Sequence, residues 1–229
     1  MKFGIINKLY REKDIEKINI KLNKLGKTKI KSAEEFITGQ ILTTLLLLLL
    51  LIIIKIKYIF IPFILISYYF LYYYTYITKP LKDRERKLER ESLVFFEVLE
   101  LTLESGKNLL NSIKLTCYNV DGDLSLEFKK SLKEVEFGRS LMEALNNMRL
   151  RIPSETINNI ILNIVETSIF GNSIVDSIHN QIDFLREKQI MDTKAMINKI
   201  PNKVSIISVL FIVPLILLII LGPFILKLL

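Results

Sequence analysis

The sequence has few of the residues that usually carry chemistry. Its 229 residues include one cysteine, one histidine and no tryptophan. A single cysteine excludes an intramolecular disulfide and a cysteine-based metal site, and a single histidine excludes a site built from several histidines. Cys117 lies on the apolar face of a predicted helix, which favours a buried small side chain over a reactive thiol. His179 is interpreted as a structural residue.

Motifs for catalysis or cofactor binding are also missing from the sequence. It contains no glycine-rich phosphate loop, no His-Glu-x-x-His, no Cys-x-x-Cys and no Gly-x-Ser-x-Gly. Asp121 and Asp123 flank one glycine, as in a calcium loop, but the later ligands of such a loop are missing. Both are therefore interpreted as residues of a turn and helix cap. We expect no enzyme activity, no cofactor and no metal.

Positive charge is concentrated near the N-terminus. The formal net charge is +8, with ten Lys/Arg and five Asp/Glu in residues 1–40 but nineteen of each in residues 79–203. Because a nucleic-acid-binding domain needs a basic face, we expect no nucleic-acid partner. The basic cytoplasmic arm, residues 1–35, instead indicates membrane orientation or contact with anionic lipid. Its loose apolar stripe leaves open a solvated tail or a helix that lies on the membrane or on a partner.

Three apolar stretches account for much of the apolar content: Ile41–Ile54, Tyr58–Ile77 and Val204–Leu226. With residues 36–40 included, the first is long enough to cross a hydrocarbon core of about 30 Å. Lys55 and Lys57 then predict a turn between two spans. In the third span we expect a kink at Pro214. No charge lies inside these stretches, which favours an anchor over a transport path.

The distribution of basic residues predicts how the spans are oriented. Ten Lys/Arg precede the first span and six follow the second within residues 79–90, whereas two lie between them. The N-terminus is therefore expected in the cytoplasm and the C-terminus outside it, in a multi-pass protein of the inner membrane. No cleavable signal peptide is expected. The tyrosine-rich end of the second span fits an interfacial belt, or a stripe of Tyr68, Tyr72 and Tyr76 that packs against a neighbouring span.

Helical periodicity dominates between the second and third spans. Six helices are predicted: a charged stalk at 81–90 that continues into 92–105, followed by 108–120, 124–137, 140–148, 153–170 and 173–200. Pro201 is expected to end the last of them. The predicted fold is an all-α membrane protein with three transmembrane helices. Its domains are a transmembrane hairpin at 36–78, a six-helix cytoplasmic bundle at 79–203 and a C-terminal transmembrane helix at 204–229.

A short pattern recurs at three predicted helix junctions, at intervals of 32 and 33 residues. A glycine can close one helix through a positive φ, and an Asn or Ser two residues later can cap the next. The pairs are Gly106 with Asn108, Gly138 with Ser140, and Gly171 with Ser173. Ser140 also precedes a Glu by three residues, as in a capping box. We expect these corners to orient helices, not to bind ligands.

The corners and the residues around them carry a resemblance to a known family. They comprise Leu103-Glu104-Ser105-Gly106, the run from Glu136 to Leu145, Phe170-Gly171, and a membrane re-entry formed by Pro201, Lys203 and Pro214. In this order, over about residues 90–225, the chain resembles the type II secretion system F domain family. Its members are inner-membrane platform proteins of type II secretion, type IV pili, Tad (tight-adherence) pili and archaeal flagella. Larger members carry two copies of the domain, and the single copy here is similar to Tad-type members.

The resemblance implies a non-catalytic platform that couples a cytoplasmic secretion ATPase to the extraction or assembly of pilins. The implied partners are a hexameric secretion ATPase, pilin or prepilin transmembrane helices, a second copy or a paralogous platform subunit, and membrane lipid. Another class of function remains open on the residues alone. It is a membrane-anchored scaffold or signalling adaptor with a small cytoplasmic partner.

Overall fold

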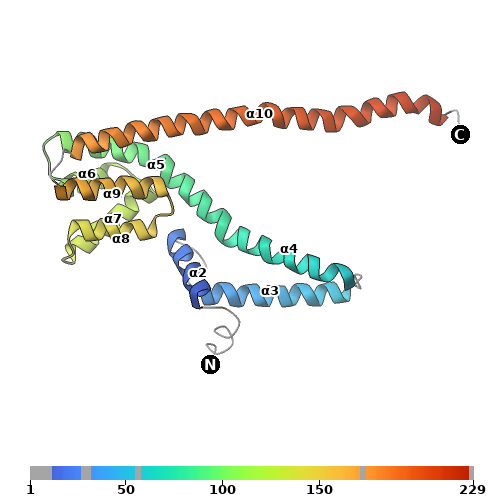
Figure 1. Cartoon of the computed structure of the whole chain (residues 1–229), viewed down its shortest axis with the longest axis horizontal. Helices are drawn as coiled ribbons and strands as arrows, with labels where there is room; N and C mark the ends of the chain where they lie inside the picture. The colour runs from blue at the N-terminus through green and yellow to red at the C-terminus, as the bar shows by residue number, and fades with distance from the viewer. Residues whose placement is uncertain (1–11, 27–31, 55–57, 171–173, 227–229) are drawn as a thin grey trace. The chain divides into compact units, whose positions relative to one another are not determined.

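The computed structural model describes residues 12–26, 32–54, 58–170 and 174–226, which are almost entirely helical. No strand occurs among these residues, and the predicted all-α class is confirmed for them. The chain divides into two compact units, Met1–Gln181 and Ile182–Leu229. The described part of the first unit holds the helices from α2 to α9 and the start of α10 (Figure 1).

Two apolar helices of the first unit pack together as a hairpin. The chain reverses direction between α3 (Ala33–Ile53) and α4 (Ile61–Tyr73), and a short 3₁₀ turn, η1 (Tyr58–Phe60), precedes α4 (Figure 1). Ser32 caps α3, because its hydroxyl accepts a hydrogen bond from the backbone N–H of Glu35 at 3.2 Å. The expected domain boundary after residue 35 falls within the first turn of this helix. The predicted turn at Lys55–Lys57 lies outside the described residues.

Among the described helices, α3 is the one that is long and apolar enough to cross a membrane by length and composition. Beyond its first two turns α3 exposes most of its leucines. The second and third spans remain predictions. Helix α4 alone has 13 residues, and the apolar segment Ser205–Leu217 of α10 is also shorter than a full span.

The second apolar stretch continues without a break into the charged stalk. A π-helix, η2 (Tyr74–Thr78), joins α4 to α5 (Lys79–Glu104). Pro80, in the first turn of α5, has no N–H to donate to the carbonyl of Tyr76, and its ring would crowd that carbonyl in a regular α-helix. The wider π turn just before it gives the ring room. One helical segment therefore leads from the hairpin to the remaining helices of the first unit.

Four short helices follow α5: α6 (Leu109–Asn119), α7 (Asp123–Glu136), α8 (Leu141–Arg151) and α9 (Glu155–Phe170) (Figure 1). Helices α6, α7 and α9 pack on α5, and α8 packs on α7 and α9. Their ends agree with the predicted ranges to within about three residues. Helix α5 contributes Phe95 and Phe96 to the core, and the Phe95 ring stacks on Phe128 of α7 with 4.4 Å between centroids. Helix α9 buries Ile157, Ile160, Ile161 and Ile164, which recur at helical spacing.

Two details of these helices differ from the sequence prediction. Asp123 does not cap α7, because the cap position is Gly122 and the N–H of Leu124 donates to Glu91 of α5 at 2.9 Å. Asp123 instead pairs with Lys87 at 2.7 Å. Pro153 precedes α9, and the hydroxyl of Ser154 accepts from the first turn at the N–H of Ile157. In both cases a side chain accepts a hydrogen bond from a first-turn N–H group that has no partner within its own helix. At α7 this side chain comes from α5, and at α9 it lies just before the helix.

The prediction that Pro201 ends a helix is wrong. Helix α10 (Ile174–Leu226) passes residue 201 without a break. A proline inside a helix costs about 3 kcal/mol through one missing hydrogen bond and a steric clash, and a helix of this length retains its other bonds. The second unit consists of the later part of α10, where the large apolar side chains between residues 206 and 220 are exposed. The kink at Pro214 remains a prediction.

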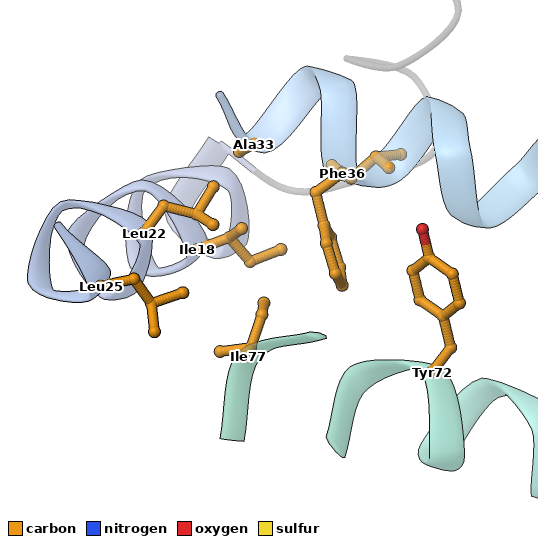
Figure 2. Packing of buried hydrophobic residues seen from close by; sticks show 8 residues of the cluster. Ile18, Leu22, Leu25, Ala33, Phe36, Tyr72 and Ile77 are labelled. Carbon is orange, nitrogen blue, oxygen red and sulfur yellow. The ribbon is translucent and has the colours of Figure 1, made fainter. Parts of the chain in front are cut away.

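The described part of the N-terminal arm is not a solvated tail. Within it, α2 (Glu12–Leu25) packs against α3, η2, α5 and α8. Its apolar stripe is buried in a cluster that we call the junction cluster, formed by Ile18, Leu22, Leu25, Ala33, Phe36, Ile37, Tyr72 and Ile77 (Figure 2). The partner of this amphipathic helix is therefore the chain itself, at the base of the hairpin.

Candidate functional site at the junction of arm, hairpin and stalk

Aromatic packing holds the base of the hairpin together. The rings of Phe36 on α3 and Tyr72 on α4 lie 5.3 Å apart between centroids (Figure 2). Tyr72 also contacts Tyr68, with 6.0 Å between ring centroids, and Tyr76, with 4.5 Å between them. A Cβ on Gly39 would lie 3.1 Å from the Tyr72 hydroxyl, so the glycine leaves room for that ring. The tyrosine stripe thus packs on the neighbouring helix of the same chain. Tyr69 and Tyr74 are exposed, as an interfacial belt would require.

A buried carboxylate lies where the stalk meets α7 and α8. The Glu127 side chain is 4% exposed, and it pairs with Arg84 of α5 at 2.8 Å, Lys130 of α7 at 2.7 Å and Arg151 of α8 at 3.2 Å. A charge removed from water in this way is costly unless partners surround it, and here three cations do so. Moving α5, α7 or α8 away would leave a buried charge without its partner, so the cluster favours this one arrangement of the three helices.

Arg84 has further partners that bring in the N-terminal arm. Its guanidinium donates to the backbone carbonyl of Lys24, in the last turn of α2, and to the carbonyl of Arg151 at 3.3 Å, at the end of α8. Carbonyls at helix C-termini lack partners within their own helix, and a cation suits their partial negative charge. The Arg84 side chain is 12% exposed. One side chain of the stalk thus connects α2, α7 and α8.

Arg151 extends the network to a second carboxylate. It donates to Glu134 at 2.8 Å, and the same carboxylate accepts from Arg139 at 2.7 Å and from Asn147 at 3.0 Å. Burial by itself would raise the pKa of Glu134. The hydrogen bonds from Asn147, Arg151 and Arg139 outweigh it and lower the pKa below the usual glutamate value. Glu134 therefore stays charged and keeps α7 and α8 joined.

Of the two described corners, one joins α5 to α6 and the other joins α7 to α8. Gly106 has φ 81° and Gly138 has φ 95°, both in the left-handed region. Asn108 accepts from the N–H of Asn111 at 2.9 Å. Ser140 accepts from the N–H of Glu143 at 3.2 Å, and Glu143 accepts from the N–H of Ser140 at 3.3 Å, which completes a capping box.

The remaining predicted residues are not brought to the junction. Gly171 and Ser173 of the third corner lie outside the described residues. Pro201, Lys203 and Pro214 lie along α10 in the second unit. Cys117 is buried, as predicted, and burial raises the pKa of its thiol to about 11. His179 lies 2.7 Å from Glu100 of α5, measured between Nδ1 and Oε1.

Sequence reasoning missed the central residues of the junction. Arg84 is one of six basic residues within 79–90, and its position in the sequence does not distinguish it from the others. Glu127 did carry a signal, because it falls beside Phe128 on the apolar stripe of the predicted helix at 124–137. A carboxylate at a core-facing position predicts a buried partner of opposite charge. Which cation pairs with Glu127 depends on how the helices pack, and the sequence pattern does not show which one it is.

Comparison with known proteins points to one family. A family model described as "Type II secretion system (T2SS), protein F" matches residues 95–222. Neither the curated proteins nor the solved structures gave a match. The matched range extends from the middle of α5 through most of α10. It includes all three predicted corners, Glu127 and the re-entry residues, whereas Arg84 and the junction cluster lie before it.

Proposed function

We propose that this chain, which belongs to the family of type II secretion system protein F, is an inner-membrane platform of a secretion or pilus-assembly machine. In this role it couples a cytoplasmic secretion ATPase to the extraction or assembly of pilin helices and carries out no catalysis itself. The family match over residues 95–222 is the observation that carries the proposal. Within this family the chain is proposed as a Tad-type member that works with a second copy or a paralogous subunit.

The proposed membrane arrangement has three spans, a hairpin at 36–78 and a C-terminal span at 204–229, with residues 79–203 in the cytoplasm. Exposed apolar side chains support it, since leucines of α3, Phe63 and Phe70 of α4, and Leu210 and Phe211 of α10 face outward. Such surfaces are stable against lipid and unfavourable in water. The twenty residues 58–77 rise about 30 Å, enough for a second span when η1 and η2 are included.

The proposed route of force follows the continuous segment from α4 through η2 to α5. A movement of the cytoplasmic helices would reach the stalk through the Glu127–Arg84 pair, and the stalk is continuous with the hairpin. The junction cluster would then carry the same movement to α2 and α3. Close packing favours transmission, because packed interiors deform little.

Deletion of residues 92–198, with a flexible linker in their place, tests the proposal. We expect the deleted chain to remain in the membrane but to abolish appendage assembly or secretion in cells. Intact assembly would contradict the platform role. As a matched control, Lys114→Gln changes an exposed residue of the same region and should leave assembly unchanged.

Co-purification from detergent-solubilised membranes separates the platform from the adaptor. The full chain should bring down a secretion-type ATPase, and the chain lacking residues 92–198 should not. Recovery of a small regulatory protein without any ATPase would instead support the membrane-anchored adaptor. Cross-linking of the full chain to pilin transmembrane helices tests the second proposed partner.

A further inference from the structure

We propose that a cleft between the stalk and α7 binds the phosphate headgroup of an anionic phospholipid. The cleft has a volume of about 1080 Å³, and its walls come from the start of α5, one face of α7, the end of α2 and one residue of η2. This inference goes beyond the platform role, and it rests on the proposed placement of the hairpin in the membrane.

The position of the cleft suits a lipid of the inner leaflet. Its walls include Thr75 of η2 and Lys79 and Pro80 of α5, which directly follow the apolar α4. If α4 spans the membrane, these residues lie at the level of the headgroups. Leu25 and Gly26, at the end of α2, line the same cleft. A lipid can therefore enter from the bilayer without crossing water.

The charges of the cleft favour an anion. Six basic and four acidic side chains line it. Glu127 is surrounded by three cations, and Asp123 pairs with Lys87 at 2.7 Å. Of the basic residues, three take part in none of the ion pairs among the described residues, and they are Lys79, Lys129 and Lys133. Two acidic residues of the wall, Asp83 and Glu136, likewise take part in none of these ion pairs. Three lysines against two carboxylates leave the uncompensated charge of the cleft positive.

Lys129 and Lys133 are placed to act together. They are four residues apart on α7, and side chains at this spacing lie on the same face of a helix. Lys79, on α5, lines the same cleft. The wall also has apolar members, Leu25, Leu126 and Leu132. Cations beside an apolar wall match a phosphate attached to a glycerol and acyl chains better than a free, fully hydrated anion.

The test measures binding of short-chain phosphatidylglycerol to the purified full chain in a non-ionic detergent, with phosphatidylcholine and inorganic phosphate as comparison ligands. We expect phosphatidylglycerol to bind at least about tenfold more tightly than either, and more weakly as salt increases. Lys129→Gln with Lys133→Gln should weaken it about thirtyfold, since one lysine beside an anionic lipid corresponds to about fivefold. Lys107→Gln with Lys114→Gln removes the same charge outside the cleft and should change binding less than twofold.

Several results would overturn the inference: equal binding of phosphatidylcholine, inorganic phosphate binding as tightly as the lipid, or the same loss in the control variant. Lys129→Arg with Lys133→Arg should retain binding, which separates loss of charge from loss of fold. Carbonate extraction of membranes tests the underlying placement independently. A chain that is integral to the membrane but shows no lysine-dependent lipid preference would refute the cleft and leave the platform role standing. A chain that washes off the membrane would refute the platform arrangement whatever the lipid result.

Discussion

The junction and the corners hold helices together in different ways. At the junction the contacts join residues far apart in the chain, such as Phe36 with Tyr72 and Arg84 with Glu127. At the corners each hydrogen bond stays within a few residues, as between Asn108 and Asn111. The corners therefore depend on local sequence, whereas the junction exists only when five helical segments are packed.

The surroundings of the two regions differ as well. Phe36 at the junction is 1% exposed, whereas Phe137, next to the Gly138 corner, is 88% exposed. No atom lies within 4 Å of a Cβ added to Gly106 or Gly138. A substitution at the junction thus removes packing and ion pairs, whereas one at Gly106 or Gly138 meets no neighbouring atom and acts through the backbone conformation. We expect larger stability losses at the junction.

Phe36→Ala should have the largest effect, about 3–5 kcal/mol of unfolding free energy, because it empties a filled site in the junction cluster. Leu46→Ala, at a position on the same helix that is 67% exposed, is the matched control and should cost much less. Reversible unfolding of the full chain in detergent micelles measures both. Equal losses of unfolding free energy in the two variants would contradict the expectation that the buried base of α3 contributes more to stability than its exposed part.

Glu127→Ala should cost about 3 kcal/mol, because Arg84 and Arg151 would lose the carboxylate that compensates their burial. The exposed Lys87–Asp123 pair provides the comparison, and Asp123→Asn should cost less than about 1 kcal/mol. The double change Arg84→Met with Glu127→Met should recover part of the loss, since Arg84 no longer leaves a charge buried without a carboxylate and Arg151 keeps its pair with Glu134. If Glu127→Ala were as mild as Asp123→Asn, the ion network would not be what holds the junction.

Gly106→Val and Gly138→Val should each cost at least about 1–2 kcal/mol, because both glycines have positive φ and valine is strained there. Asparagine tolerates that conformation, so Gly106→Asn and Gly138→Asn should cost clearly less. Thermal unfolding of the four variants measures the difference. Wild-type stability in both valine variants would show that the corners do not contribute as proposed.

The smallest expected effect concerns pH. The folded pKa of Glu134 is lowered, so its stabilising contribution is present above the unfolded pKa, about 4.3, and is lost as pH falls through the folded pKa. Glu134→Gln should therefore be less stable than wild type at pH 7, and the difference should shrink below about pH 4. Denaturant unfolding at pH 7, 5, 4 and 3 measures it. A constant difference across this range would contradict the assigned pKa direction.

The outcomes of the sequence predictions follow the same division. The helices α5 to α9 and the cap residues Asn108 and Ser140 lie where periodicity and capping rules place them, because both depend on neighbours in sequence. The end predicted at Pro201 was wrong, since one proline is a local cost that a long helix can tolerate. The sequence leaves the arm open between a tail and a docked helix, because the surface that receives α2 comes from helices as far along the chain as α8.

By itself the sequence determined the helical class, the apolar stretches, the corner residues and the likeness to the type II secretion F family. Each of these rests on composition, on spacing or on contacts within one turn of helix. Only the tertiary structure decided that α2 covers the base of the hairpin, that a π-helix leads past Pro80 into the stalk, and that Arg84 meets Glu127. These depend on which side chains meet across helices, where burial converts an ordinary surface charge into an interaction that the fold must satisfy.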